Sequence, residues 1–171
     1  KGDGTILNSI VNIFKREGFE ILSFIDIFPN EFLLDREYLN PSDNILKDIT
    51  KGKKILDALS VFDNAQACVV SNGYILSIEA VEGTDLMLKR LPQIKKKISR
   101  YGTYEGCLIK IPKINQNLKI DLPTVGIETL ELMSKSKLSF LAIKQKETIV
   151  VNKIEFYKKL KKKKIGLMFI R

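Results

Sequence analysis

A β-hairpin is the feature of this sequence that most limits how the chain can fold. Two apolar, β-rich runs, ACVVS at residues 67–71 and YILSI at residues 74–78, flank the pair Asn72-Gly73. Asn-Gly is the pair that two-residue hairpin turns prefer, because both residues tolerate a positive φ. The second run leads directly into EAVEGTD, residues 79–85, after which helical periodicity begins. We therefore expect a hairpin that delivers the chain to an acidic turn and then to a helix.

The other predicted elements alternate in type along the chain. Ile6, Ile10 and Phe14 recur at helical spacing, and Gly18 ends that helix. Further helices are predicted for a short piece at residues 31–34, for residues 42–66 with Ser42 or Asp43 as cap and Gly52 as a break, for residues 85–99, from about Thr124, and for residues 153–164. Strands are predicted at residues 19–24, 105–112, 139–151 (two short strands) and 165–170. This alternation favours a single α/β domain, with a mixed sheet, packed helices and β-hairpins.

The chain is basic, with a formal net charge of +9 over 171 residues, and it is 44% hydrophobic, which is enough for a core. A basic surface favours nucleic acid, phosphorylated small molecules or an anionic membrane, although a general abundance of lysine explains the charge equally well. The densest block, residues 158–164, fits either a solvated helix face or a phosphate- or membrane-binding patch. Aromatic residues are few, at 8%, and no stacking motif is visible, so nucleic acid is the least favoured partner.

The lack of histidine narrows the chemistry, because His bases, His metal ligands and Ser-His or Cys-His pairs are excluded. Cys68 and Cys107 lie far apart in apolar runs, which is typical of reduced core thiols in a cytoplasmic protein. No apolar run approaches the ~20 residues of a membrane helix, so we expect a cytoplasmic protein that is peripheral to a membrane at most. The chain opens with KGDGTIL and no Met, so we expect a fragment with upstream residues missing.

The acidic turn carries three carboxylates, those of Glu79, Glu82 and Asp85. If Thr84 caps the following helix, free backbone N–H groups of the first turn can bind phosphate, and Gly83 lets a ligand approach closely. Carboxylate oxygens at the end of a strand also suit Mg²⁺, which bridges carboxylate and phosphate. The alternative is purely structural: Asp85 favours the helix dipole, Thr84 caps, and Glu79 faces solvent.

A second carboxylate precedes a second predicted helix start. Asp121 comes just before Pro123 and Thr124, which are good helix-start residues. The cations nearest to it in sequence, which could hold phosphates as point charges, are Lys110, Lys113 and Lys119. The alternative is a polar surface loop before a capped helix.

Together these stretches resemble one family. FDNAQACVVSNGYILSIEAVEGTDLMLKR, residues 62–90, is similar to its block of an aspartate, a glutamine, a hairpin and Glu-Ala-x-Glu-Gly-Thr-Asp with a nearby Arg. GCLIKIPKINQNLKIDLPTVGIETL, residues 106–130, is similar to its second block, which contains Asp-x-Pro-Thr-x-Gly. The opening GDGTIL resembles its Gly-Asp-x-x-Leu-Leu entry motif. The family is the two-domain UDP-2,3-diacylglucosamine pyrophosphatase of lipid A biosynthesis, which is not calcineurin-like.

The resemblance implies that residues 1–171 are the C-terminal, catalytic-type domain of a two-domain enzyme whose N-terminal domain is missing from this chain. It implies Mg²⁺-dependent hydrolysis of UDP-2,3-diacylglucosamine to UMP and 2,3-diacylglucosamine 1-phosphate, at the cytoplasmic face of a Gram-negative inner membrane. The implied catalytic and metal-binding residues are Glu82, Asp85 and Asp121. The implied substrate-binding residues are Gly83, Thr84, Arg90, Lys110, Lys113, Gln116, Asn117 and Thr124. Second-tier candidates are Glu79, Asp63 and Gln66.

This chain departs from the family pattern in the second block. Where the family has Lys-Pro-x-Gln-Asp-x-Arg, the proline is Ile114, the aspartate is Asn117 and the arginine is Lys119. Asn keeps a carbonyl ligand but loses the charge, and Lys cannot make the bidentate contact of Arg. Two alternatives therefore stay open: a non-catalytic basic module that binds a nucleotide, nucleic acid or anionic lipid, and a domain that mainly packs against a partner domain or a second copy of itself as a homo-oligomer.

Overall fold

The fold is built on a mixed five-stranded sheet with the order β2-β1-β3-β5-β7. The computed structural model describes residues 3–98, 105–114 and 116–171. The strands are β1 (Ala67–Ser71), β2 (Tyr74–Ile78), β3 (Gly106–Lys110), β5 (Leu138–Lys144) and β7 (Gly166–Ile170). Strand β1 is antiparallel to β2 and β3, and β3, β5 and β7 are parallel. The ends of β2, β3, β5 and β7 and the start of β1 therefore share one edge, here called the carboxyl edge.

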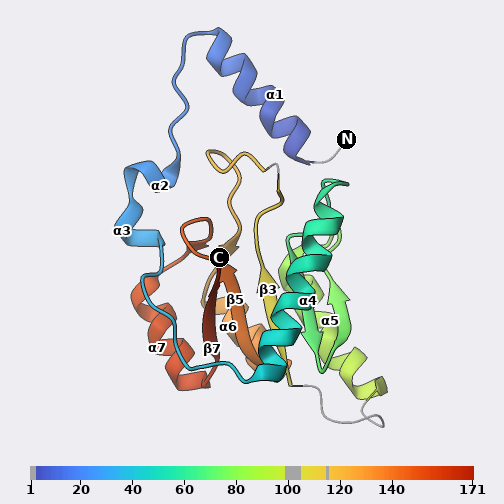
Figure 1. The fold of residues 1–171 in the computed structure, drawn as a ribbon. Coiled ribbons are helices and arrows are strands. Elements are labelled where there is room, and N and C mark those ends of the chain that lie inside the picture. The colour runs from blue at the N-terminus through green and yellow to red at the C-terminus, as the bar shows by residue number, and fades with distance from the viewer. Residues whose placement is uncertain (1–2, 99–104, 115) are drawn as a thin grey trace.

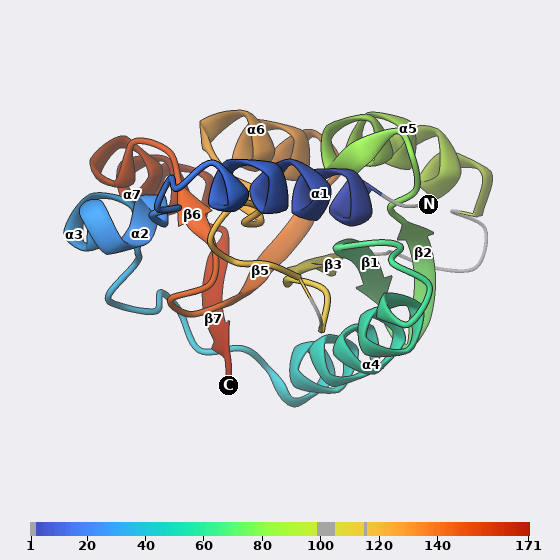
Figure 2. The ribbon, with the colours of Figure 1, turned by 90° about the horizontal axis from the view of Figure 1, so that it is seen from above.

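Helices cover both faces of this sheet. Helix α4 (Asp43–Ser60) lies on one face, and α5 (Gly83–Ile98), α6 (Ile127–Lys135) and α7 (Lys153–Lys163) lie on the other (Figure 2). Each face has its own hydrophobic cluster, one with Leu130 and Phe156 and the other with Leu56 and Ile109 at their centres. The predicted α/β domain with a mixed sheet and packed helices is confirmed.

The hairpin is confirmed, and a buried carboxylate fixes its turn. Residues Ser71 and Tyr74 pair across the turn, and Asn72 and Gly73 both have positive φ. The side chain of Asp48, from α4, accepts hydrogen bonds from the amides of Asn72 at 2.8 Å and Gly73 at 2.7 Å. The turn is thus bonded to the helix that packs beside it.

The N-terminal segment differs from its prediction in one element. Helix α1 (Asp3–Arg16) forms as expected, followed by the short helices α2 (Phe24–Ile27) and α3 (Pro29–Phe32). The strand predicted at residues 19–24 is wrong: these residues run without a partner strand into α2, whose N-cap is Ser23. Phe19 and Leu22 are 60% and 56% exposed, and Phe19 stacks edge-on against Phe14 of α1 and not against a strand.

Two predicted helix boundaries are also wrong. Gly52 does not break α4, which is continuous; its lack of a side chain instead makes room for the sheet, because a Cβ there would lie 2.6 Å from Cδ1 of Ile109. Thr124 does not start a helix. Thr124–Val125 forms β4, which pairs in parallel with β6 (Ile149–Val150), and α6 begins after Gly126. Pro123, just before β4, is also bonded to β6, since the Ile149 amide donates to the Pro123 carbonyl at 2.8 Å.

The lysine block and the cysteines behave as structural features. Lys159 and Lys163 of α7 both pair with Glu131 of α6, at 2.6 and 3.0 Å, which favours the structural interpretation for these two lysines. Cys68 and Cys107 are buried free thiols, as predicted, and burial raises the pKa of both, that of Cys68 to about 12. Among the residues that the structure describes, no helix has the length and apolar character needed to cross a membrane.

Candidate functional site

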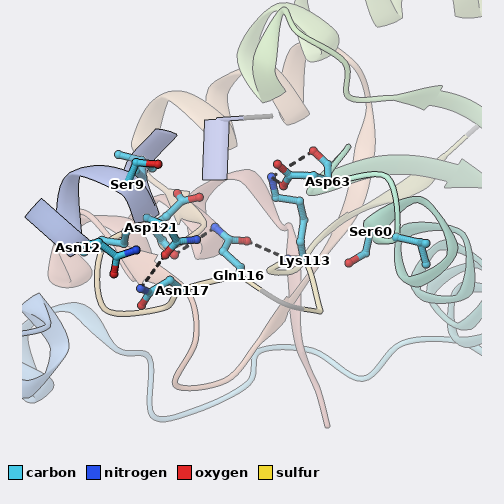
Figure 3. A pocket seen from close by; sticks show the side chains of 12 residues that line it. Ser9, Asn12, Ser60, Asp63, Lys113, Gln116, Asn117 and Asp121 are labelled. Carbon is cyan, nitrogen blue, oxygen red and sulfur yellow. Dashed lines mark hydrogen bonds and ion pairs between the residues drawn. The ribbon is translucent and has the colours of Figure 1, made fainter. Parts of the chain in front are cut away.

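A polar cleft of about 460 Å³ opens at the carboxyl edge of the sheet. Helix α1 crosses above this edge (Figures 1 and 2) and forms one wall, while the end of α4 and the loop after β3 form the others. The polar side chains of the lining are those of Asn8, Ser9, Asn12, Ser60, Asp63, Lys113, Gln116, Asn117 and Asp121 (Figure 3). Ligands of open α/β sheets bind at this edge. The residues predicted from sequence that line the cleft are Asp63, Lys113, Gln116, Asn117 and Asp121. The predicted residues outside its lining include Glu82, Gly83, Thr84, Asp85, Arg90, Lys110 and Thr124.

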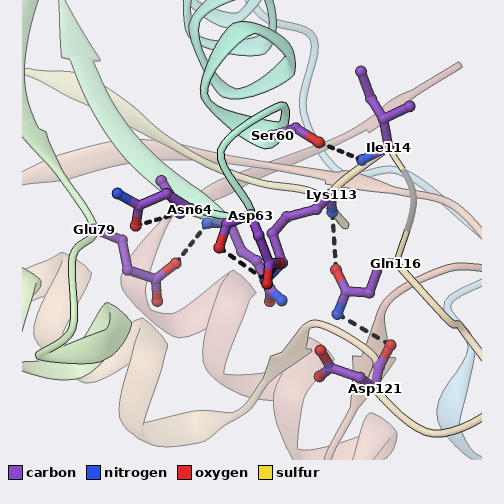
Figure 4. A network of polar contacts seen from close by, with 10 residues as sticks. Ser60, Asp63, Asn64, Glu79, Lys113, Ile114, Gln116 and Asp121 are labelled. Carbon is purple, nitrogen blue, oxygen red and sulfur yellow. Dashed lines mark hydrogen bonds and ion pairs between the residues drawn. The ribbon is translucent and has the colours of Figure 1, made fainter. Parts of the chain in front are cut away.

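The loop after β3 is held in shape by its own side chains. Gln116 accepts from the Lys113 amide at 2.8 Å and donates to the Asp121 carbonyl at 3.1 Å (Figure 4). The Ile114 amide donates to Oγ of Ser60 at 2.6 Å, which fastens the loop to the end of α4. Three of the predicted residues, Lys113, Gln116 and Asp121, are therefore brought together, and Gln116 orients the other two.

Lys113 faces an acid across the cleft. Its side chain is only 11% exposed, and its ammonium group is paired with the carboxylate of Asp63 (Figure 4). It also donates to the Asp63 carbonyl at 3.3 Å. Asp63 has φ 54°, a left-handed conformation that turns its side chain and its carbonyl toward the same partner. An anionic ligand would have to compete with Asp63 for this lysine.

Asn117 contacts helix α1. Its side-chain amide donates to Oδ1 of Asn8 at 3.0 Å, and its own Oδ1 accepts from the Lys119 amide at 3.2 Å. A carboxylate could not donate to Asn8. An aspartate at position 117 would keep this contact only if the Asn8 amide turned its N–H₂ toward the carboxylate.

The acidic turn differs from its prediction. Thr84 is not the N-cap of α5, since the helix begins at Gly83, and its hydroxyl donates to Oε1 of Glu79 at 2.6 Å. The hydroxyl also accepts from Nζ of Lys110 at 2.8 Å, so its hydrogen and one of its two lone pairs are used by side chains. Gly83 has φ +76°, which explains why a glycine stands at the point where strand becomes helix. The predicted backbone donors remain at this turn, but side-chain capping by Thr84 is wrong.

Lys110 joins the two predicted blocks. Its ammonium group donates to Thr84 of the first block and, at 2.9 Å, to the carbonyl of Thr124 in the second. Burial lowers its pKa, and three carboxylates act in the opposite direction, those of Glu79, Asp85 and Asp121. Two acids that sequence analysis placed in separate motifs, Asp85 and Asp121, thus act on the same cation.

Glu82 and Arg90 form an ion pair of their own at 2.6 Å. Arg90 also donates to the Ile78 carbonyl at 2.9 Å, at the end of β2. Among the described residues, no group of three or more acidic or cysteine side chains lies close enough to hold a metal ion. The metal set of Glu82, Asp85 and Asp121 therefore stays a prediction.

Sequence reasoning missed the wall supplied by α1 and the contact made by Ser60. Asn8, Ser9 and Asn12 lie between the apolar residues that were used to predict the helix, and polar residues on a helix give no signal of what they face. The role of Ser60 depends on a loop 54 residues away in the chain. Glu79 was a second-tier candidate, yet both of its carboxylate oxygens accept hydrogen bonds.

The architecture is that of an α/β domain with a polar cleft at the carboxyl edge of its sheet, and the charged side chains of that cleft are those of Asp63, Lys113 and Asp121. The profile of the LpxI C-terminal domain matches residues 36–168, and the chain belongs to this family. It is similar to the UDP-2,3-diacylglucosamine pyrophosphatase LpxI of Caulobacter vibrioides, with 32% identity over 157 residues. That alignment covers 90% of this chain and 56% of the relative, so the chain spans little more than half of the length of that protein.

Proposed function

We propose that the full-length form of this protein hydrolyses the pyrophosphate bond of UDP-2,3-diacylglucosamine. Water adds to the phosphorus on the uridine side, and the bond from that phosphorus to the bridging oxygen breaks, giving UMP and 2,3-diacylglucosamine 1-phosphate. The observation that supports the proposal is the bridge made by Lys110 between Thr84 and Thr124, because it joins the two stretches that resemble the family's motifs. Family membership and the name of the Caulobacter relative support the substrate.

Asp85 and Asp121 suit a Mg²⁺ site best, because both act on Lys110 and both offer hard oxygen ligands. Glu82 would join them only after release from Arg90. Bound there, Mg²⁺ would supply charge neutralisation at the pyrophosphate and a more acidic water. A carboxylate of this set is the general base, since the chain has no histidine.

The substrate would lie along the cations and amides of the edge. Gly83 and Thr84 offer backbone N–H groups to the phosphates. Lys110 and Lys113 offer positive charge, and Arg90 does so if Glu82 exchanges it for the metal. The remaining contacts proposed from the cleft lining and its neighbours are Gln116, Asn117 and Thr124.

The test is UMP release by the full-length protein with Mg²⁺ and with excess chelator. We expect metal-dependent release, and Asp85→Asn and Asp121→Asn should each lower kcat on the order of 100-fold or more with the fold intact. Glu128→Gln is the matched control, because Glu128 is exposed and only pairs with Lys89 at 3.7 Å. Near-normal turnover in both aspartate variants would contradict the proposed catalytic role of Asp85 and Asp121.

We propose that an N-terminal domain packs on α1 in the full-length protein. The helix directs Asn8 and Asn12 to the cleft and leaves Ile6, Ile10 and Ile13 exposed, whereas a helix at a free surface has the opposite arrangement. Residues 1–35 also precede the matched domain, and the relative is longer than this chain.

With a glycolipid substrate and a basic surface, the protein would work at the cytoplasmic face of the inner membrane.

A second candidate function is favoured by Asn117. An amide at the position of the family's aspartate, hydrogen-bonded to Asn8, suits a domain that binds the nucleotide-linked ligand without hydrolysing it. Full-length protein that binds the substrate and releases no UMP would establish this alternative. Asn117→Asp would then be expected to raise turnover, whereas in an active enzyme it would chiefly weaken the contact with α1.

If apolar α1 contacts a second copy instead of a domain, light scattering of the full-length protein will show a homo-oligomer.

A further inference from the structure

Glu79 is the acid whose carboxylate is most fully engaged around the proposed site. It is the first residue after β2, and its Oε2 accepts from the Gln66 amide at 2.8 Å, just before β1. Its Oε1 accepts from the Thr84 hydroxyl at 2.6 Å, at the start of α5. Glu79 therefore ties the two ends of the hairpin to the acidic turn, and both of its oxygens are committed to that task.

The hydrogen bonds from Glu79 onward have one possible direction. The ammonium group of Lys110 can only donate, so the Thr84 hydroxyl must accept from it. The hydroxyl has a single hydrogen, which is then available only for Glu79. Lys110 uses a further hydrogen for the Thr124 carbonyl. These three hydrogen bonds connect Glu79, Thr84, Lys110 and Thr124 in that order. We call this hydrogen-bond network the clamp.

The clamp lies between the two acids proposed to act on the substrate. Thr84 is 6% exposed and adjoins Asp85 in sequence, and Thr124 follows Asp121 by three residues. Among the described residues, these two turns belong to different sheets, since β4 pairs with β6, and the helices that follow them, α5 and α6, pack against each other farther along. A contact of this kind can fix the separation of Asp85 and Asp121 although none of its side chains reaches the reacting atoms.

We propose that Glu79 is a positioning residue of the site: through Thr84 and Lys110 it holds the turn bearing Asp85 at a fixed place relative to the loop bearing Asp121. The proposal rests on the proposed function for its kinetic consequence. In this role, Glu79 contacts neither the metal nor the substrate. The main role of Lys110 is then to connect the two turns. Displacement of a reacting group by about 1 Å can cost on the order of 100-fold in rate, so loss of the clamp should lower kcat more than it raises KM.

The first test uses isosteric variants of the full-length protein. Glu79→Gln puts an amide N–H₂ against a donor at one of its two contacts, and Thr84→Val removes the hydroxyl without changing shape. We expect each to lower kcat by about 10- to 100-fold with KM little changed. Thr84→Ser, which keeps the hydroxyl, should have a higher kcat than Thr84→Val. The double variant Glu79→Gln/Thr84→Val should be no slower than the slower single variant, because both remove one unit. Glu128→Gln is the control for replacing an acid by an amide.

The second test needs no activity. Acetylation of lysines followed by mass spectrometry compares Lys110 with exposed Lys161 in the same molecule. Lys110 should be labelled several-fold faster in Glu79→Gln and in Thr84→Val than in wild type, with Lys161 unchanged. If wild type releases no UMP, the proposed function fails and the clamp is judged by this labelling alone. Unchanged labelling of Lys110 in both variants, or a wild-type kcat in Glu79→Gln of an active enzyme, overturns the proposal.

Discussion

Residues 3–35 and residues 36–171 bury their apolar side chains to very different extents. The first segment leaves nine large apolar residues exposed: Ile6, Ile10, Ile13, Phe14, Phe19, Leu22, Phe24, Ile27 and Phe28. In the second segment, both faces of the sheet are covered, and residues such as Phe156 and Leu130 are fully buried. The matched C-terminal domain begins at residue 36, close to this change, since Leu34 is already 4% exposed and belongs to the same cluster as Phe156. The comparison teaches that burial and the family match agree: residues 36–168 match the C-terminal domain and contain most of the buried core, while the preceding segment leaves most of its large apolar side chains exposed.

The largest expected contrast is between two phenylalanines. Phe156→Ala should lower the free energy of unfolding by about 3–5 kcal/mol, because Phe156 is fully buried between α7 and the sheet. Phe19→Ala should change it by about 0.5 kcal/mol or less, because Phe19 is 60% exposed. Urea denaturation of this chain gives both values. Equal losses in the two variants would mean that the first segment is packed as firmly as the domain, and the comparison would fail.

Gly52 allows the packing of the domain to be probed more finely. Gly52→Ala would place a Cβ 2.6 Å from Cδ1 of Ile109, and overpacking of a buried contact outweighs the gain of up to ~1 kcal/mol from helix propensity. We expect a net loss of about 1–2 kcal/mol in urea denaturation. Ile109→Val removes the obstructing Cδ1, so Gly52→Ala should cost less in that background than in wild type. Strictly additive effects would show that the helix and the sheet are not in the close contact described.

Local sequence signals predicted the elements of the domain, because they depend on nearby residues. The hairpin at Asn72-Gly73 and the cap at Ser42 both formed as predicted, because the residues that favour them are local, although Asp48 of α4 adds hydrogen bonds to the hairpin turn. The strand at residues 19–24 failed because a strand needs a neighbour, and sequence periodicity does not say whether one is present. Gly52 failed as a break because its reason for being glycine lies in Ile109, 57 residues along the chain.

The candidate site was predictable in composition but not in connectivity. The motifs identified Asp85, Lys110 and Asp121 as candidates. Only the fold shows that the ammonium group of Lys110 joins the turn after β2 to the segment that follows Asp121. The spacing around Thr84 predicted a cap, because Thr before a helix usually bonds to the backbone. Here its hydroxyl instead bonds to a glutamate and a lysine from two different strand ends. Tertiary structure decides whether the Thr84 hydroxyl bonds to the helix backbone or to the side chains of Glu79 and Lys110.

The smallest expected effect tests how the domain holds its outer helices together. Lys159 and Lys163 hold the pKa of Glu131 down, at about 2, so the ionised carboxylate is favoured in the folded state. A group with a depressed folded pKa contributes stability above its unfolded pKa, near 4.5, and loses it as pH falls toward 2. Glu131→Gln should therefore make the acid side of the stability profile shallower between pH 4.5 and 2 and change little at neutral pH in high salt. Thermal unfolding at several pH values, with exposed Glu128→Gln as control, measures this difference. An identical acid profile in the two variants would show that the α6–α7 ion pairs add nothing to the stability of the domain.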